Sequence, residues 1–178
     1  MKTKLFAVSL LAGFLLVCSL PARAAGPLAG RLGARMGFSA PGAADEYFRQ
    51  YDVFYDFDLP WRWQRPDGWL IVSGADLSLG VLQGGGEKAA IGSGGLLLRF
   101  IRGITTVQLG GSVAGLSKNN LGNADFGGPL QFLAYVGLDF QLTRHLAVGG
   151  RLQHMSNGHL YHKNPSLNQG MLQLTFAF

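Results

Sequence analysis

Residues 130–141 read LQFLAYVGLDFQ, and hydrophobicity alternates along them with a period of two. The even positions are all apolar, whereas the odd positions include Gln131, Asp139 and Gln141. Successive side chains of a β-strand point to opposite faces, so this spacing is typical of a strand. The stretch therefore predicts a β-strand with one apolar face and one mostly polar face.

The same alternation recurs along the rest of the chain. The other segments are residues 30–38, 47–59, 69–81, 91–102, 104–116, 146–156 and 171–178. Eight alternating strands predict an all-β fold in which an antiparallel sheet closes into a barrel. Beyond residue 25 no stretch approaches the roughly 18 to 20 apolar residues of a transmembrane helix, which excludes a helical membrane protein.

The composition is unusual for a soluble protein. Only 14% of the 178 residues are charged and 27 are glycine, whereas soluble domains carry about 25% charged residues. The formal net charge of +5 comes largely from Lys2, Lys4 and Arg23 at the N-terminus; without them, 12 basic residues face 10 acidic ones. The remainder has no basic run, which excludes a nucleic-acid-binding protein.

The positions of the charges distinguish between two kinds of barrel. A soluble barrel turns its apolar faces inward and binds a ligand, whereas an outer-membrane barrel turns them toward lipid and fills a narrow lumen with polar groups. Arg49 lies on an apolar face, but near a strand end, where a long side chain reaches the interface. Arg49 is the main exception, because eight other strand charges of both signs lie on the polar faces, which favours the eight-stranded outer-membrane barrel: Arg31, Arg35, Asp52, Asp56, Asp76, Arg99, Asp139 and Arg151.

Connection lengths then orient the barrel. An even number of strands leaves both termini in the periplasm, with short turns there and longer loops outside. The predicted outer loops are residues 39–46, 83–90, 117–128 and 157–168, and the predicted inner turns are residues 60–68, 102–103 and 142–145. Three tryptophans, at positions 61, 63 and 69, cluster near the inner boundary, as expected of an aromatic belt.

The N-terminus has the pattern of a secretory signal peptide. Basic Lys2 and Lys4 precede an apolar stretch, and Ala22-Arg23-Ala24 forms a small-x-small cleavage site. The prediction is a signal peptide over residues 1–24 and an outer-membrane barrel over residues 25–178. Cys18 is the only cysteine, so the exported protein would contain no disulfide; Val17 before it disfavours a lipoprotein.

Two polar residues interrupt the apolar face of the segment 146–156. Its lipid-facing series runs Leu146, Val148, Gly150, Leu152 and then His154 and Ser156. An imidazole and a hydroxyl two residues apart on one strand face supply a general base and a nucleophile. An ionisable group facing lipid is by default a functional candidate, although both residues would also be tolerated at the head-group level.

The block His154-Met155-Ser156-Asn157-Gly158, followed by an Asn-Pro hairpin and a last strand that ends in Phe178, resembles the lipid A 3-O-deacylase family, the PagL-like acyloxyacyl hydrolases. The stretch from Tyr51 to Trp63 is also similar to members of that family. The resemblance implies an eight-stranded barrel in the outer membrane of a Gram-negative bacterium, with its active site on the outside wall and lipid A of lipopolysaccharide as substrate.

By this resemblance, Ser156 attacks the ester carbonyl of the 3-position hydroxyacyl chain, and His154 carries the proton. Asn164 stabilises the oxyanion, together with the backbone N–H of Gly158 and with Asn157 in the same block. The resemblance implies no metal and no cofactor. A zinc site formed by His154, His159 and His162 is disfavoured, because the set lacks an acidic or thiol ligand.

The third member of the implied triad departs from the family pattern. The family places a glutamate about a dozen residues beyond the serine, where this sequence has Asn168, and no carboxylate follows Arg144. An amide carbonyl orients an imidazole without stabilising the imidazolium by charge. Three readings follow: a slow enzyme, an acid supplied by another loop such as Asp45 or Glu46, or a non-catalytic barrel with a structural or surface-interaction role.

Overall fold

The computed structural model describes residues 30–39 and 46–178. The predicted signal peptide, Asp45 and most of the predicted outer loop 39–46 lie outside these residues. In the part that is described, no helix is long and apolar enough to cross a membrane.

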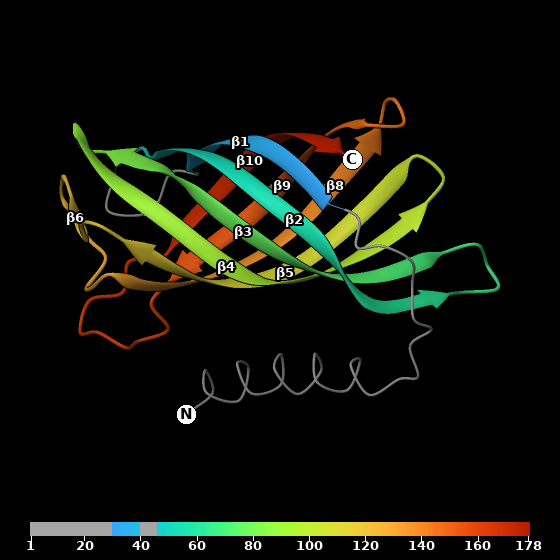
Figure 1. Cartoon of the computed structure of the whole chain (residues 1–178). Helices are drawn as coiled ribbons and strands as arrows, with labels where there is room; N and C mark the ends of the chain where they lie inside the picture. Colours follow the sequence, from blue (N-terminus) through green and yellow to red (C-terminus); the bar gives the residue numbers. More distant parts are fainter. Residues whose placement is uncertain (1–29, 40–45) are drawn as a thin grey trace.

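Eight long antiparallel strands close into a barrel in the order β1-β10-β9-β8-β5-β4-β3-β2 (Figure 1). This confirms the predicted all-β, eight-stranded architecture. The strands of the barrel are β1 (Gly30–Ser39), β2 (Arg49–Gln64), β3 (Leu70–Gly84), β4 (Glu87–Arg102), β5 (Thr105–Leu116), β8 (Leu130–Gln141), β9 (Leu146–Ser156) and β10 (Leu167–Ala177). A small hairpin of β6 (Asn120–Leu121) and β7 (Ala124–Asp125) lies between β5 and β8.

The predicted bounds are correct for β8 and β9 but wrong at two turns. The predicted inner turn over residues 60–68 is strand as far as Gln64, because a register shift between Asp58 and Arg62 accommodates Pro60, which has no N–H for the ladder. The predicted outer loop over residues 83–90 is a tight turn at Gly85 and Gly86. Both of these glycines have positive φ, which a two-residue hairpin with a type I′ turn requires.

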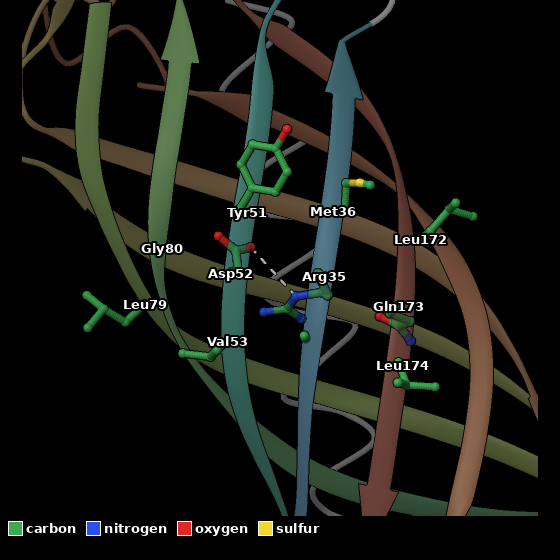
Figure 2. A pocket seen from close by; sticks show the side chains of 11 residues that line it. Arg35, Met36, Tyr51, Asp52, Val53, Leu79, Gly80, Leu172, Gln173 and Leu174 are labelled. Carbon is green, nitrogen blue, oxygen red and sulfur yellow. Dashed lines mark ion pairs between the residues drawn. The ribbon is translucent and has the colours of Figure 1, made fainter.

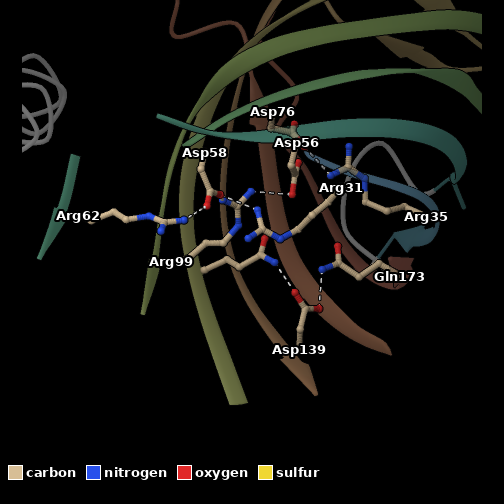
Figure 3. Close-up of polar contacts among 10 residues, drawn as sticks. Arg31, Arg35, Asp56, Asp58, Arg62, Asp76, Arg99, Asp139 and Gln173 are labelled. Carbon is tan, nitrogen blue, oxygen red and sulfur yellow. Dashed lines mark hydrogen bonds and ion pairs between the residues drawn. The ribbon is translucent and has the colours of Figure 1, made fainter. Parts of the chain in front are cut away.

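Charged side chains fill the middle of the lumen, as predicted (Figure 3). Arg99 is almost completely buried and donates hydrogen bonds to Asp56 (3.0 Å) and Asp58 (2.8 Å). Arg35 donates to Asp76 at 3.1 Å. The apolar side chains on the alternate positions are exposed, for example Leu152 at 68%, so the apolar faces form the outside wall.

The outer end of the lumen is closed by apolar side chains, which the strand alternation did not predict. Phe48, Leu82 and Met155 are completely or almost completely buried there, and Leu121 and Phe126 enter from the loop between β5 and β8. The rest of this cluster is Ala89, Ile91, Ala114, Leu116, Ala124, Leu133 and Leu167. The lumen therefore has a polar middle and an apolar outer plug, with no room for a large lipid.

The strands are staggered around the barrel. A rung of paired residues that begins at Gly30, at the inner end of β1, passes through β2, β3, β4, β5 and β8 to His154 on β9 and Asn168 on β10. Asn168 is one residue before Gln169, which pairs with Ser39 at the outer end of β1. Rungs therefore climb from the inner to the outer end around the barrel, as the tilt of a closed barrel requires.

Candidate active site

The outer ends of β9 and β10 bring His154 and Asn168 together. The two residues are direct partners in the ladder, and both are exposed on the apolar outside wall. His154 Nδ1 and Asn168 Oδ1 are 2.7 Å apart. When the amide oxygen accepts, Nδ1 carries the proton, and the lone pair of Nε2 is left to accept a proton from a nucleophile.

Ser156 lies two residues beyond His154 on the same face of β9. It is half-buried, and its partner across the ladder is Phe132 on β8. The side chains of residues i and i+2 on a strand point the same way. The structure therefore places a hydroxyl, an imidazole and an amide on one face of the outside wall, on two neighbouring strands.

Asn157 is buried and holds the loop that follows Ser156. Its Nδ2 donates to the backbone oxygens of Phe126 (2.9 Å) and Lys163 (2.6 Å), and its Oδ1 accepts from the N–H of His159 (2.9 Å). The side chain is therefore fully used within the protein. Of the predicted substrate-binding residues, Asn157 is the one that the structure places away from the outside wall.

Gly158 forms the turn directly after Asn157. Gly158 and His159 both have positive φ, and the N–H of Leu160 donates to the carbonyl of Asn157 at 3.1 Å. A turn with positive φ at both central positions favours glycine there, and Gly158 supplies it at the first position. The turn leaves Gly158 exposed beside Phe132 and close to Ser156 in the chain.

Asn164 lies against the start of the same turn. Its Oδ1 accepts from the backbone N–H of Asn157 at 2.9 Å. Since a backbone N–H can only donate, this contact fixes the orientation of the amide and leaves its NH2 group to donate elsewhere. Asn164 is half-buried, so this donor is positioned rather than mobile.

The loop between β5 and β8 supports the active-site loop, a contact that sequence reasoning missed. The ring of Tyr161 covers Gly128 so closely that a Cβ at this position would overlap the ring. Lys163 Nζ lies 2.9 Å from Asp125, and its hydrogen bond lowers the pKa of that carboxyl. The adjacent pair Gly127-Gly128 was the one available signal of such a close approach.

Glu46, one of the acids considered as a substitute for the missing glutamate, is used elsewhere. Its carboxylate accepts from the N–H of Asn123 at 2.7 Å and lies against Gly122 and Gly85. Asp45 is outside the described residues. Among residues 30–39 and 46–178, no group of three His, Cys, Asp or Glu side chains is arranged to hold a metal ion.

Comparison of the sequence with models of known protein families identifies the family of this chain. The sequence model of the lipid A 3-O-deacylase (PagL) family matches residues 49–177. The chain belongs to the lipid A 3-O-deacylase family. Its function is therefore deacylation of lipid A, a hydrolase activity, and its substrate is lipid A of lipopolysaccharide in the outer membrane.

Solved structures agree with the fold of this lipid A 3-O-deacylase family member. The crystal structure of the outer membrane enzyme PagL matches with a TM-score of 0.71 and 19% identity, over 82% of this chain and 97% of that one. A de novo designed transmembrane β-barrel matches with a TM-score of 0.50 and 9% identity, over 88% of this chain and 100% of the design. No curated protein sequence matches.

Proposed function

We propose that this family member is a serine esterase in which Ser156 is the nucleophile, His154 the general base and Asn168 the residue that orients the imidazole. The observation that carries the proposal is the contact between His154 Nδ1 and Asn168 Oδ1 on the outside wall, with Ser156 beside it on the same strand face. This arrangement supports Nε2 of His154 as the proton acceptor for the serine hydroxyl.

The reaction would proceed in two half-reactions. Ser156 Oγ attacks the carbonyl carbon of the 3-position hydroxyacyl ester as His154 Nε2 takes its proton. The tetrahedral intermediate then collapses, the sugar alkoxide leaves with that proton, and the acyl chain remains on Ser156. Water, deprotonated by His154, attacks the acyl-enzyme; the bond between the acyl carbon and Ser156 Oγ then breaks, Ser156 recovers the proton from His154, and the fatty acid is released.

The oxyanion would be stabilised from the loop between β9 and β10. The NH2 group of Asn164 and the backbone N–H of Gly158 are the two proposed donors. Preplaced donors stabilise the charge that develops on the carbonyl oxygen, because they need no reorganisation during the reaction. Asn157 contributes indirectly, by holding both donors through its buried hydrogen bonds.

Asn168 makes the proposed triad electrically neutral. Its carbonyl selects the productive tautomer of His154 but adds no negative charge beside the imidazolium that forms during the reaction. If the amide rotates, its NH2 group donates to Nδ1 instead and selects the unproductive tautomer, the effect that lowers kcat by about 10⁴ when the triad acid of a serine protease becomes an amide. We therefore expect a slow enzyme.

The outside wall also suits the substrate. A diglucosamine lipid does not fit a lumen filled by ion pairs and closed by an apolar plug, so the reacting groups must lie where the acyl chains already are. We further propose that residues 1–24 direct export and are removed after Ala24, which N-terminal sequencing of the membrane-inserted protein would test.

Mass spectrometry of lipid A from cells expressing the protein tests the proposed function. Lipid A should lose one hydroxyacyl chain in cells with the wild-type protein and keep it in cells with Ser156→Ala. Both proteins should be present in the outer membrane in equal amounts. If lipid A loses the chain in both strains, Ser156 is not the nucleophile; if it keeps the chain in both, the proposed serine mechanism is overturned.

A further inference from the structure

A row of polar side chains crosses the outside wall far from Ser156. Arg49 on β2 pairs with Gln83 on β3, and Gln83 pairs with Lys88 on β4. Arg49 and Lys88 are exposed and Gln83 is half-buried. The next lipid-facing row, closer to the middle of the wall, consists of Tyr51 and its partners on β3 and β4, and these partners are apolar. The row therefore marks the outer boundary of the lipid-facing band.

The two cations of this row differ from two lysines at the same end of the barrel. Lys118 and Lys163, at the same end of the barrel, form salt bridges with Glu87 and Asp125. No carboxylate of residues 30–39 or 46–178 forms such a bridge with Arg49 or Lys88. Uncompensated cations at the edge of a lipid-facing surface attract anionic head groups.

The stagger of the barrel gives the depth of Arg49. A rung from Tyr55 on β2 reaches Ser156 in five steps between strands. Each step of about 4.8 Å climbs about 3 Å when strands tilt by about 40°, so Ser156 lies about 15 Å outward of Tyr55. Arg49, six residues outward of Tyr55 on the same tilted strand, also lies about 15 Å beyond it. Arg49 is therefore at the depth of the proposed nucleophile.

An apolar groove begins at Tyr51, two residues inward of Arg49 on β2. Figure 2 shows the side chains that line this groove. Its volume is about 640 Å³ and it crosses β10, β1, β2 and β3. Ala34 forms part of its floor, and Tyr51, Val53, Leu79, Leu172 and Leu174 line it with exposed side chains. The groove is open to the lipid side, and its apolar lining suits an acyl chain.

We propose that this face is a second, non-catalytic binding site for phosphorylated lipid A: Arg49 and Lys88 bind head-group phosphate, and the groove holds an acyl chain. Charge complementarity selects the occupant, because the outer leaflet supplies lipids with phosphate groups and acyl chains joined at this depth. Arg49 on β2 and Lys88 on β4 are each three strands from β9, counted in opposite directions around the barrel, although the groove itself reaches β10. The two cations are therefore placed to bind the head group of a different lipid molecule from the one at Ser156, and the proposal does not depend on the catalytic mechanism.

Native mass spectrometry of the complete barrel, in the Ser156→Ala background so that bound lipid is not hydrolysed, tests this site. Titration with bisphosphorylated lipid A should show two binding events. Arg49→Gln with Lys88→Gln should weaken one event at least about tenfold, since charge-assisted hydrogen bonds are lost. The other event should be unchanged. Equal binding with and without the two substitutions would overturn the proposal.

Control variants separate local contacts from overall charge. Lys118→Gln removes a cation that Glu87 already neutralises and should leave both events intact; weakening equal to that of the double variant would overturn a local site. Ala34→Phe, which fills the groove without changing charge, should weaken only the second event. If Ala34→Phe leaves that event unchanged, the groove is not part of the site.

Two further ligands identify the source of the phosphate. Dephosphorylated lipid A should give a single binding event, and millimolar inorganic phosphate should not displace the second lipid. Displacement by inorganic phosphate, or two events with dephosphorylated lipid, would overturn a phosphorylated-lipid site. With Ser156 restored, the double variant should retain wild-type deacylation, so failure here is distinguishable from failure of the catalytic proposal.

Discussion

The lumen and the outside wall of this barrel both contain polar groups, but they treat charge in opposite ways. In the lumen, Arg99 is 1% exposed and touches two aspartates. On the outside wall, the proposed triad of Ser156, His154 and Asn168 contains no permanent charge. A charge is tolerated where a partner and hydrogen bonds compensate its desolvation, and it is expensive where it faces hydrocarbon.

This contrast suggests a physical reason for an amide, rather than a carboxylate, at position 168. A glutamate at that position would face the lipid side, and its negative charge would be desolvated whenever His154 is neutral. The amide removes that cost and keeps the hydrogen bond, at the expense of charge stabilisation during catalysis. If Asn168 has its proposed role, the site has a lower desolvation cost at the lipid boundary and a lower rate than a site with glutamate.

The largest effect is expected from removing the nucleophile on the outside wall. Ser156→Ala should lower deacylation by at least about 10³-fold, because only binding and the oxyanion donors remain. The barrel should unfold at the wild-type temperature, since Ser156 is half-buried and lies at a strand end. Purified enzyme assayed on lipid A, with thermal unfolding in parallel, checks both. A variant that retains activity would remove Ser156 from the mechanism.

In the lumen, Arg99→Met should instead reduce stability. The substitution removes the buried cation that pairs with Asp56 and Asp58. Breaking a buried ion pair in this way typically lowers the free energy of unfolding by about 3–5 kcal/mol. Urea unfolding in lipid vesicles measures the loss. The control is Arg65→Met, which breaks an exposed pair with Asp67 and should change the free energy of unfolding by less than about 1 kcal/mol. Equal effects of the two substitutions would contradict a stabilising lumen network.

Asn168→Glu places charge on the wall and tests the neutrality of the proposed triad. We expect kcat to rise about 100-fold, less than the roughly 10⁴ associated with an amide in a serine protease, because the amide carbonyl already selects the productive tautomer. Asn168→Ala is the matched control and should lower kcat. A drop in kcat for Asn168→Glu would show that a carboxylate at position 168 cannot act as the acid of the triad.

The smallest expected effect concerns the contact between the two outer loops. Gly128→Ala puts a methyl group where the Tyr161 ring lies, and such overpacking costs about 1–3 kcal/mol. The active-site loop should loosen, and kcat should fall severalfold more than KM changes. Tyr161→Phe removes only the long hydrogen bond from the N–H of Leu130 (3.4 Å) and should be close to wild type. Normal kinetics for Gly128→Ala would argue against a supporting role for this contact.

The sequence predicted the barrel well because its main determinant is local. Period-two alternation is readable residue by residue, and it gave β8 and β9 their correct bounds. It also placed His154 and Ser156 on the outside wall. The turn residues were less readable: Pro60 suggested a break, whereas the longer hairpin of β2 and β3 accommodates it with a register shift.

The contacts between outer loops could not be predicted in the same way. Asn157 binds the backbone of Phe126, 31 residues away, and no periodic pattern connects the two. The apolar plug was missed for a related reason. The residues that face the lumen near the outer ends of the strands, such as Leu82 and Met155, are apolar. Because the prediction assigned polar residues to the whole lumen, it did not distinguish this apolar outer end from the polar middle.

The apolar plug makes the barrel an electrical insulator. Phe48, Phe126 and Leu121 are buried at the outer end and offer an ion no water-like oxygen, and ion pairs occupy the lumen behind them. A hydrolase whose reacting groups face outward needs no opening at all. We therefore expect the barrel, reconstituted in a planar bilayer, to give no steady ion conductance.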